Sequence, residues 1–398
     1  MTTQESISIS APVDEAELRA FAAFPEHAFA SNPSPNPDIS WLQRQGIENF
    51  RVVRVRGRIV GGLGIIPMGQ WFGGKSVKMV GIDAVAIAPE YRSTGIASRL
   101  LRSMLEEVRD QGFPISTLYP ATQPVYRRAG YEQAGVSVRY QQPAHALTPR
   151  DRSLEVRPLE DGEESIMHSL YSERARRTAG NLDRAPMMWE EMLQSKDAVI
   201  NKYVVERDGT PEGYLVYHQA QRPGQQERNI IARDLVALTP DAGRRLLSLL
   251  ADHRSVVSNV VWSGPPAEPL LFHMANQDYK IVHYDQWMLR LVDVRTALES
   301  RGYPQALSTE VHLEVHDDLL GWNNGRVVLT VSEGRAEVRE GGEGRVRVDM
   351  RSLASIYSGY LTPQEMLSAS GHIVGREADL AAIGLVFSGP VPWMPDHF

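Results

Sequence analysis

The sequence predicts an α+β protein with three consecutive domains, and three observations indicate this fold class. A chain of 398 residues usually forms two to four domains, at roughly 100–200 residues each. A pattern of strand, proline, turn and leucine-rich helix occurs near residue 85 and again near residue 236. From about Leu291 the sequence changes to short alternating strands followed by helical segments. We therefore expect domains at 1–148, 149–290 and 291–398, the first two α/β and the third α+β.

The composition narrows the class of protein. The hydrophobic fraction is 42% and the charged fraction 23%, both ordinary for a globular protein. The net charge of −7 argues against nucleic acid as a partner and leaves room for a cationic substrate. The absence of cysteine excludes disulfides, thiolate metal sites and a cysteine nucleophile. Because no signal peptide or long apolar run is recognisable, we expect a cytoplasmic protein without a membrane partner.

The first domain contains a predicted hairpin. The sequence from Phe50 reads FRVVRVRGRIVGGLG, in which β-branched runs flank an Arg-Gly-Arg turn. Gly61, Gly62 and Gly64 resemble part of a phosphate-binding GxGxxG motif, but no helix opens behind them. They therefore indicate a bulge or a close backbone contact.

A strand and a helix follow, joined by the loop PEYRSTGIA. Residues 77–88 form the predicted strand, which Pro89 ends because proline cannot donate to a ladder. After Gly95 apolar residues recur at steps of three and four, the pattern of an amphipathic helix: Ile96, Leu100, Leu101, Met104, Leu105 and Val108.

This loop has features of an anion site. The first N–H groups of a helix lack intrahelical partners, and its dipole favours an anion. Gly95 permits close approach of a ligand, Ala97 and Ser98 are small, and Arg92 adds a positive charge. The loop suits a pyrophosphate, although a plain strand–turn–helix with an exposed arginine explains the same residues.

The next segment favours the pyrophosphate reading. A strand, PISTLYPA, is followed by TQPVYRRAGYEQAG. A strand–helix–strand unit with R-x-x-G-x-A at its first turn, then Y-x-x-x-G-Y-x-x-x-G, resembles the GCN5-related N-acetyltransferase (GNAT) family. The resemblance implies acetyl-CoA as co-substrate. It implies that Val85, Ala86 and Ile87 pair with pantetheine. The implied pyrophosphate loop comprises Arg92, Ser93, Thr94, Gly95, Ile96, Ala97 and Ser98, and Ala121 and Thr122 would contact CoA beyond it.

The second domain repeats the first in a reduced form. KYVVERDGTPEGYLVYH matches the first hairpin, and NIIARDLVALTPDAGRRLLSLLADH matches the strand, loop and helix. The second loop is shorter and lacks the segment that would surround a pyrophosphate. We therefore expect a degenerate GNAT-like domain without cofactor, which helps to form the substrate site.

The third domain, with alternating strands and turn signals at residues 323–325 and 333–334, resembles a sterol-carrier-protein-like fold. His312, Glu314 and His316 alternate and so lie on one strand face. They are possible zinc ligands, but a solvated face or dimer contact is the preferred reading, and we expect no metal.

The order of the domains resembles the Eis-type (enhanced intracellular survival) N-acetyltransferases of the GNAT superfamily. The resemblance implies acetylation of primary amines such as those of aminoglycosides, and a homo-oligomer, a hexamer. It implies a tyrosine as general acid and the terminal carboxylate as general base, here Tyr126 and Phe398. A tyrosine, with a pKa near ~10, is protonated at neutral pH and suits a departing thiolate. Tyr119 and Tyr131 compete for this role.

The substrate site is less sharply indicated. Glu26 resembles the acid with which the family holds an ammonium group, although it also fits a solvated surface. Phe24 and Trp41 are candidate aromatic walls, or ordinary packing residues. The C-terminal SGPVPWMPDHF is rich in proline and aromatic residues. It either packs on its own domain or, as the resemblance implies, enters the first domain, where Asp396 is the nearest competing carboxylate.

Two other functions remain open on the sequence. The third domain favours a lipid or sterol carrier, which requires a large apolar tunnel there. A non-catalytic acyl-CoA sensor would keep the pyrophosphate loop and tolerate loss of Tyr126. The intact loop in the first domain favours the enzyme or the sensor over the carrier. The main prediction is an acetyl-CoA-dependent N-acetyltransferase acting on a small cationic substrate that is aminoglycoside-like or polyamine- or lysine-like.

Overall fold

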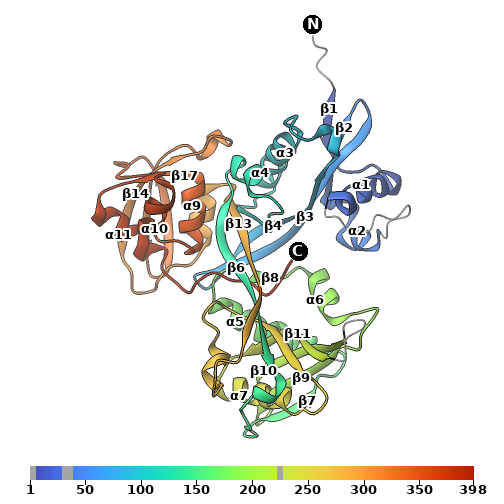
Figure 1. The fold of residues 1–398 in the computed structure, drawn as a ribbon. Coiled ribbons are helices and arrows are strands. Elements are labelled where there is room, and N and C mark those ends of the chain that lie inside the picture. The colour runs from blue at the N-terminus through green and yellow to red at the C-terminus, as the bar shows by residue number, and fades with distance from the viewer. Residues whose placement is uncertain (1–5, 29–38, 222–226) are drawn as a thin grey trace.

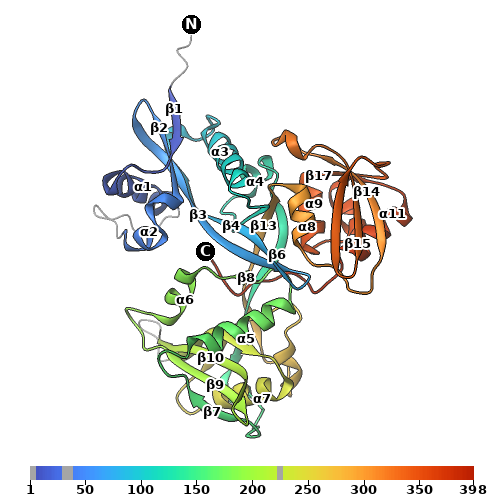
Figure 2. The same ribbon diagram turned by 180° about the vertical axis from the view of Figure 1, so that it is seen from behind.

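The computed structural model describes residues 6–28, 39–221 and 227–398, without the side chains of residues 26–28. The chain forms three lobes (Figures 1 and 2). A single 13-stranded sheet passes through the first two lobes, and the third lobe has its own five-stranded sheet. The prediction of an α+β protein is confirmed, but the fusion of the first two sheets was not foreseen.

The first lobe begins with a meander that the sequence predicted in part. Strand β2 (Phe50–Val55) and strand β3 (Arg58–Phe72) form the expected hairpin, with Arg56 and Gly57 in left-handed conformations at its turn. The edge is completed by β1 (Ile7–Ser10), and two helices, α1 (Glu15–Ala28) and α2 (Ser40–Gln45), cover one side. The η1 turn (Ile47–Asn49) leads into β2.

Strand β4 (Lys75–Ile87) pairs with β3 along its whole length, but with β5 (Ile115–Leu118) only over Met79–Gly81. Beyond Gly81 the two parallel strands therefore separate. The register with β3 shifts between Gly62 and Gly64, and Ala84 on the opposite strand has a positive φ of 50°. This bulge turns the end of β4 away from β5 and opens the sheet.

The glycines of β3 allow two close approaches at this bulge. A Cβ atom at Gly61 would lie 2.2 Å from the carbonyl oxygen of Ala86, and one at Gly64 would lie 1.9 Å from Oδ1 of Asp83. The predicted role of these glycines in a bulge and close packing, rather than in phosphate binding, agrees with this geometry.

Helix α3 (Ile96–Asp110) follows β4 after the short η2 turn (Pro89–Tyr91). All six apolar residues that predicted the helix are buried, so the periodicity identified its inner face correctly. The first lobe continues through β5, α4 (Gln123–Arg128) and the long strand β6 (Glu132–Pro143), followed by the η3 turn (Ala144–Ala146).

The two lobes share strands in an order that local patterns do not reveal. Strand β13 (Lys280–Leu291), the last strand before the third lobe, lies between β5 and β6. On its other side β6 pairs with β12 (Asn259–Ser263) of the second lobe. Each lobe thus supplies a strand to its neighbour's part of the sheet, which fixes their relative position.

The second lobe repeats the strand and helix order of the first. Its strands are β7 (Glu155–Pro158), β8 (Leu182–Asp183), β9 (Asn201–Arg207), β10 (Thr210–Gln221), β11 (Arg228–Ala237) and β12. Its helices are α5 (Glu164–Arg176), α6 (Pro186–Leu193), α7 (Pro240–Ala251) and the η4 turn (Pro269–His273). Strands β11 and β12 are parallel and pair only over Asn229–Ile231, so this sheet also opens.

The third lobe has strand order β16-β15-β14-β17-β18. These strands are β14 (Thr309–His316), β15 (Gly325–Ser332), β16 (Arg335–Glu340), β17 (Val346–Asp349) and β18 (Ile373–Val374). The helices are α8 (Val294–Ser300), the η5 turn (Gly321–Asn323), α9 (Met350–Ser358), α10 (Pro363–Ser370) and α11 (Glu377–Val386). Arg351 of α9 bonds Glu132, and Ser355 bonds the carbonyl of Gln133, so this lobe is joined to β6.

The C-terminal segment leaves the third lobe and runs between the other two, where the chain ends (Figures 1 and 2). The backbone N–H of Met394 donates to the Val136 carbonyl at 3.0 Å, and that of Trp393 donates to the Ala179 carbonyl at 2.9 Å. Trp393 and Met394 are buried. These contacts tie the segment to β6 and to the second lobe.

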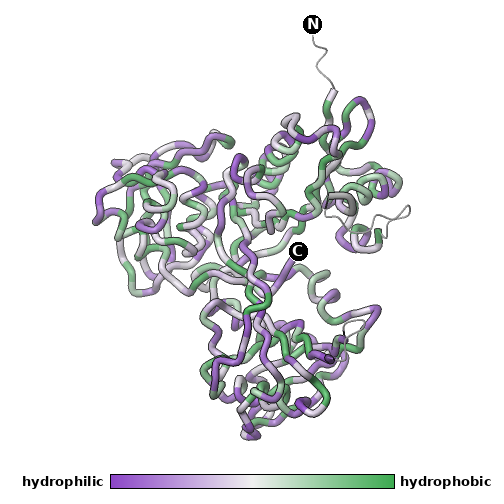
Figure 3. The backbone as a smooth tube through the Cα atoms, in the orientation of Figure 1, coloured by the Kyte–Doolittle hydropathy of each residue, from purple (hydrophilic) through white to green (hydrophobic). Residues whose placement is uncertain are grey.

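Hydrophilic and hydrophobic stretches of the chain are mixed throughout all three lobes in Figure 3. Within the described ranges, no helix combines the length and the apolar character needed to cross a membrane.

Candidate active site

A cavity of about 480 Å³ lies where β4 separates from β5 and meets α3 and α4. Most residues predicted to bind the cofactor line it. They are Val85, Ala86, Ile87, Arg92, Ser93, Gly95, Ala97, Ser98, Ala121 and Thr122, and Tyr126 lines it as well. The structure thus brings the predicted loop, strand and helix together at one opening of the sheet.

Two residues of the predicted loop, Thr94 and Ile96, do not line the cavity. The Ile96 side chain is buried with the apolar face of α3. The Thr94 hydroxyl donates to the Tyr91 carbonyl at 2.6 Å and so closes the turn before the helix. Only their backbone N–H groups remain available to a ligand at the helix start.

The start of α3 has the character of an anion site. Gly95 is its N-cap with φ of 86°, Ser93 has φ of 62°, and no side chain caps the helix. The first N–H groups of α3 are therefore free of side-chain acceptors beside a cavity that Arg92 and Arg128 line. This arrangement fits the pyrophosphate of a coenzyme A ester. A Cβ atom at Gly95 would meet nothing within 4 Å, so glycine is needed there for backbone conformation.

The end of β4 fits the extended arm of the same ligand. Residues 82–87 have no strand partner on the β5 side, because β5 pairs with β4 only as far as Gly81. Their backbone groups line the cavity at Val85, Ala86 and Ile87. An amide-containing chain can pair with this free edge as an added strand does.

Tyr126 lies on α4 and lines this cavity. Its side chain is buried, its ring packs edge-on against Tyr131 at 6.1 Å, and burial raises the pKa of its hydroxyl to about 12. The phenol therefore stays protonated throughout the neutral range. Its hydroxyl has no hydrogen-bond partner within the described ranges, so its proton is available to a ligand.

The two competing tyrosines have engaged hydroxyls. Tyr131 is completely buried, and its hydroxyl is 2.7 Å from Oγ of Ser116. The Tyr119 hydroxyl donates to the backbone carbonyl of Asp396 at 2.8 Å. Neither lines the cofactor cavity, so the geometry favours Tyr126 as a proton donor.

A second cavity, of about 590 Å³, lies between the first and second lobes. Trp41, predicted as an aromatic wall, lines it together with Phe398. Phe24 does not line this cavity; it packs half-buried against two apolar clusters that both include residues of β2. The side chain of Glu26 lies outside the described residues, so its predicted role stays a prediction.

Asp83 is a candidate site residue that sequence reasoning missed. It lies on β4 directly before the bulge and lines the cavity between the lobes. Its nearest polar partner is Nε2 of Gln45, at 3.4 Å from Oδ1. Burial raises the pKa of its carboxyl to about 6. The sequence feature that could have indicated Asp83 is its position as a lone carboxylate in the apolar strand VGIDAVAI.

The end of the chain reaches the same place from the third lobe. The ring of Phe398 packs against β4, because a Cβ atom at Gly81 would lie 2.6 Å from its Cε2. The same ring lies edge-on to Tyr119 at 5.9 Å, while His397 stacks on Tyr119 at 4.3 Å. Phe398 therefore lies at the point where β4 and β5 separate, as Asp83 does.

A buried ionic network holds the segment just before the terminus. Asp396 Oδ1 accepts a hydrogen bond from Nε of Arg184 at 2.9 Å, and Nη1 of Arg184 donates to Asp234 at 2.6 Å. Asp234 also bonds Tyr214 at 2.7 Å and Arg174 at 3.3 Å. Because both arginines surround it, the pKa of Asp234 is lowered although burial acts in the opposite direction. Asp396, the competing carboxylate, is thus engaged in an ion pair.

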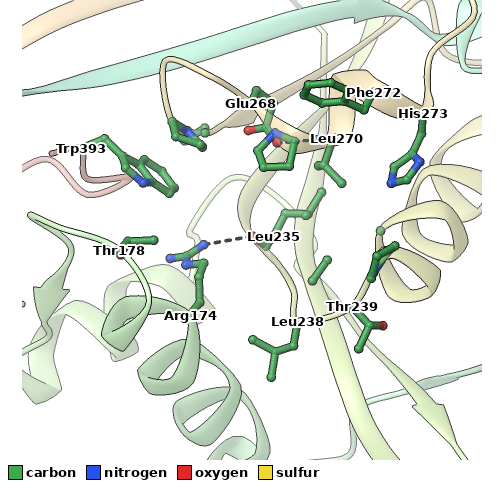
Figure 4. A pocket seen from close by; sticks show the side chains of 17 residues that line it. Arg174, Thr178, Leu235, Leu238, Thr239, Glu268, Leu270, Phe272, His273 and Trp393 are labelled. Atoms are coloured by element: carbon green, nitrogen blue, oxygen red, sulfur yellow. Dashed lines mark hydrogen bonds between the residues drawn. The ribbon is translucent and has the colours of Figure 1, made fainter. Parts of the chain in front are cut away.

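The second lobe has a cavity of about 450 Å³ where its own sheet opens (Figure 4). It lies between Arg174, Trp393 and the Leu270 side chain, and its lining is mostly apolar. Two residues, 238 and 239, separate β11 from α7 here, whereas residues 88–95 separate β4 from α3. Thr239 caps α7 by accepting from Ala242 N. This opening therefore lacks the uncapped, arginine-bearing loop of the first lobe.

The histidines of β14 have individual partners. His312 contacts Glu310 at 3.0 Å, His316 contacts Asp318 at 2.9 Å, and Glu314 pairs with Arg326 at 3.0 Å. Among the residues that the structure describes, no three side chains are placed to hold a metal ion.

Comparison with known proteins identifies the class of fold and site. Models of an acetyltransferase (GNAT) domain match residues 11–134 and 180–291, and a sterol carrier protein domain model matches residues 294–395. A crystal structure of a GCN5-related N-acetyltransferase from Anabaena variabilis has a TM-score of 0.93 and 36% identity. It covers 99% of this chain and 100% of that one. The chain belongs to the GCN5-related N-acetyltransferase (GNAT) family.

Curated relatives narrow this class. An N-acetyltransferase of Streptomyces avermitilis is 27% identical over 349 residues, 82% of this chain and 83% of that one. The N-acetyltransferase Eis of Mycobacterium tuberculosis is 25% identical over 335 residues, 78% of each chain. The protein is thus an Eis-like N-acetyltransferase with tandem GNAT domains and a sterol-carrier-like C-terminal domain. The predicted family, fold class and enzyme class are confirmed, and GNAT acetyltransferases use acetyl-CoA.

Proposed function

We propose that the protein transfers an acetyl group from acetyl-CoA directly to a primary amine of a small substrate. The observation that carries this proposal is the convergence of Tyr126, Asp83 and Phe398 on the opening between β4 and β5. The cofactor cavity is lined by Val85 and the cavity between the lobes by Asp83, two residues apart on β4. The amine classes that we consider are aminoglycoside-like, polyamine-like and lysine-like.

Different residues of the chain bind the two parts of acetyl-CoA and donate the proton. The start of α3, with Arg92 and Arg128, holds the pyrophosphate, and the free edge at Val85, Ala86 and Ile87 holds the pantetheine arm. Acetyl-CoA supplies an acetyl thioester. Tyr126, protonated because burial raises its pKa to about 12, donates a proton to the thiolate that leaves.

The ammonium group of the substrate must lose a proton before the neutral amine can attack the thioester, and a carboxylate can accept that proton. We assign this role to the α-carboxylate of Phe398, whose ring is anchored beside Gly81. Asp83 lies on the same strand and adds negative charge that attracts the ammonium group. The cytoplasmic location and the hexameric assembly remain predictions, which cell fractionation and light scattering will test.

Two measurements test the function. Release of CoA is followed with a panel of aminoglycosides, polyamines and lysine-bearing peptides, and we expect turnover with at least one primary amine. The base is tested by appending two glycines after Phe398, which keeps the ring and removes the carboxylate from its position. We expect the extended protein to bind CoA normally and to lose most of its kcat.

A Phe398→Leu variant is the matched control, since it keeps the carboxylate and changes only the ring. If the extended protein turns over as fast as wild type while folded and bound to CoA, the terminal carboxylate is not the base. If no amine in the panel supports CoA release, the proposed activity is wrong.

A further inference from the structure

We propose that Tyr119 is a positioning residue, which holds the last three residues of the chain and with them the terminal carboxylate. This inference rests on the proposed function, in which the α-carboxylate of Phe398 accepts the proton of the amine. It follows from the contacts that the Tyr119 side chain makes with three consecutive residues of the tail.

Tyr119 lies on a segment that belongs to the cofactor site as well. It directly follows β5, at the point where β5 and β4 separate. The chain continues through Ala121 and Thr122, which line the cofactor cavity, into α4 with Tyr126. One short stretch, residues 119–126, therefore carries both the proposed proton donor and the side chain that contacts the tail.

The side chain of Tyr119 contacts each of the last three residues. Its hydroxyl donates to the backbone carbonyl of Asp396 at 2.8 Å. Its ring stacks on His397, with the ring centres 4.3 Å apart and an angle of 18° between the two planes. The same ring meets the Phe398 ring edge-on at 5.9 Å. One side chain thus holds a backbone group and two consecutive rings of the tail.

The other polar anchors of the tail end before its last two residues. The backbone of residues 393–394 is hydrogen-bonded to neighbouring segments, and the Asp396 carboxylate is ion-paired. Among the residues that the structure describes, His397 and Phe398 make no hydrogen bond, and each has its ring contact with Tyr119. The directional contacts that orient these two residues therefore come from Tyr119, which adds to the packing of the Phe398 ring against β4.

The hydroxyl of Tyr119 serves as a fixed hydrogen-bond donor rather than as an acid. Burial raises its pKa far above the ordinary value, so the group stays protonated across the neutral range. A phenylalanine at this position would keep the ring contacts and leave the Asp396 carbonyl without this donor. A leucine would remove the ring contacts as well. The two substitutions therefore separate the hydrogen bond from the ring packing.

The first test measures how firmly the tail is held, without any amine. Carboxypeptidase A releases a C-terminal phenylalanine when the end of the chain is free, and loss of Phe398 from the folded, full-length protein is followed by mass spectrometry. We expect release to be about 3- to 10-fold faster in Tyr119→Phe, the factor that one hydrogen bond contributes, and faster still in Tyr119→Leu. Tyr203→Phe is the matched control and should behave as wild type, since it alters a half-buried, stacked tyrosine of the second lobe. Equal release from wild type and from both Tyr119 variants would overturn the inference.

The second test asks whether Tyr119 affects turnover through the terminal carboxylate. The kcat of CoA release is measured with kanamycin, spermidine and Nα-acetyllysine in the natural chain and in the chain extended by two glycines, each with and without Tyr119→Phe. We expect Tyr119→Phe to lower kcat about 3- to 10-fold in the natural chain, with the KM for acetyl-CoA unchanged. In the extended chain it should have no further effect, because the carboxylate is already displaced.

The outcomes separate this inference from the function on which it rests. An equal loss of kcat on Tyr119→Phe in both chains, or no loss in either, would overturn the positioning role and leave the proposed activity standing. Full turnover by the extended chain would overturn the assignment of the terminal carboxylate as the base. Absence of turnover with all three amines would overturn the proposed activity itself.

Discussion

Replacement of Asp83 by asparagine should stabilise the protein at alkaline pH. The carboxyl group lines the cavity between the lobes, with Nε2 of Gln45 at 3.4 Å as its nearest polar partner. Burial therefore disfavours its ionised form and raises its pKa from 3.8 to about 6. An asparagine of similar shape stays neutral at every pH and avoids this cost.

The size and sign of the effect follow from linkage. Below pH 3.8 the carboxyl is neutral in both folded and unfolded chains, and there is no penalty. As the pH rises through 3.8 and then 6, the unfolded chain ionises first and the stability of the folded state falls. The full difference corresponds to about 3 kcal/mol at pH 8. Because Asp83 is only half-buried by its exposed area, we expect a measured gain of about 1–3 kcal/mol.

The assay is denaturant unfolding of wild type and Asp83→Asn at pH 4.5 and pH 8. The stability difference should favour the variant at both values, and at pH 4.5 it should be about a third of its size at pH 8. Asp197→Asn, an exposed residue after α6, should show no such pH-dependent difference. A variant that is no more stable than wild type at pH 8 would refute the argument that burial, uncompensated by partners, governs this carboxylate.

Three further predictions concern the cofactor site and the tail. Gly95→Val should weaken CoA binding at least tenfold, measured by calorimetry, because the φ of 86° is strained for valine at the helix start; unchanged affinity would contradict the loop assignment. Tyr126→Phe should lower kcat about 10²-fold in CoA-release assays while CoA affinity is kept; a kcat equal to wild type would remove Tyr126 from the mechanism. Arg184→Met should cost about 3–5 kcal/mol in denaturant unfolding, since Asp396 loses its buried partner and Asp234 one of two. Unchanged stability would show that the network is dispensable.

The elements that the sequence predicted are those with local signals. The hairpin around Arg56 and Gly57 depends on two turn residues, and α3 depends on apolar spacing within one helix. The cofactor loop was likewise predictable because its glycine, small residues and arginine are contiguous in sequence. The orientation of individual side chains within the loop was less predictable. Ile96 is buried and the Thr94 hydroxyl bonds the carbonyl of Tyr91 in its own loop, and both details depend on the packing of α3.

Features that depend on distant contacts were not predictable in this way. The insertion of β13 between β5 and β6 pairs residues such as Met288 and Leu118, which are far apart in sequence. No local pattern specifies which strand fills that gap. Asp83 becomes prominent only because Gly64, on the neighbouring strand, makes room for it and Gln45 approaches it. Arg139 and Arg233 line the same cavity only because the two sheets are fused.

The route of the tail explains why extension of the C-terminus is a clean experiment. The backbone of residues 392–394 is hydrogen-bonded to Val136 and to residues 179–181, and Asp396 is ion-paired with Arg184. A buried ion pair adds little net stability, because desolvation offsets most of the attraction, but breaking it leaves an unpaired buried charge. These contacts all precede the last two residues. Glycines added after Phe398 therefore leave the upstream path unchanged and displace the carboxylate alone, so a loss of turnover in that variant reports on the carboxylate rather than on the fold.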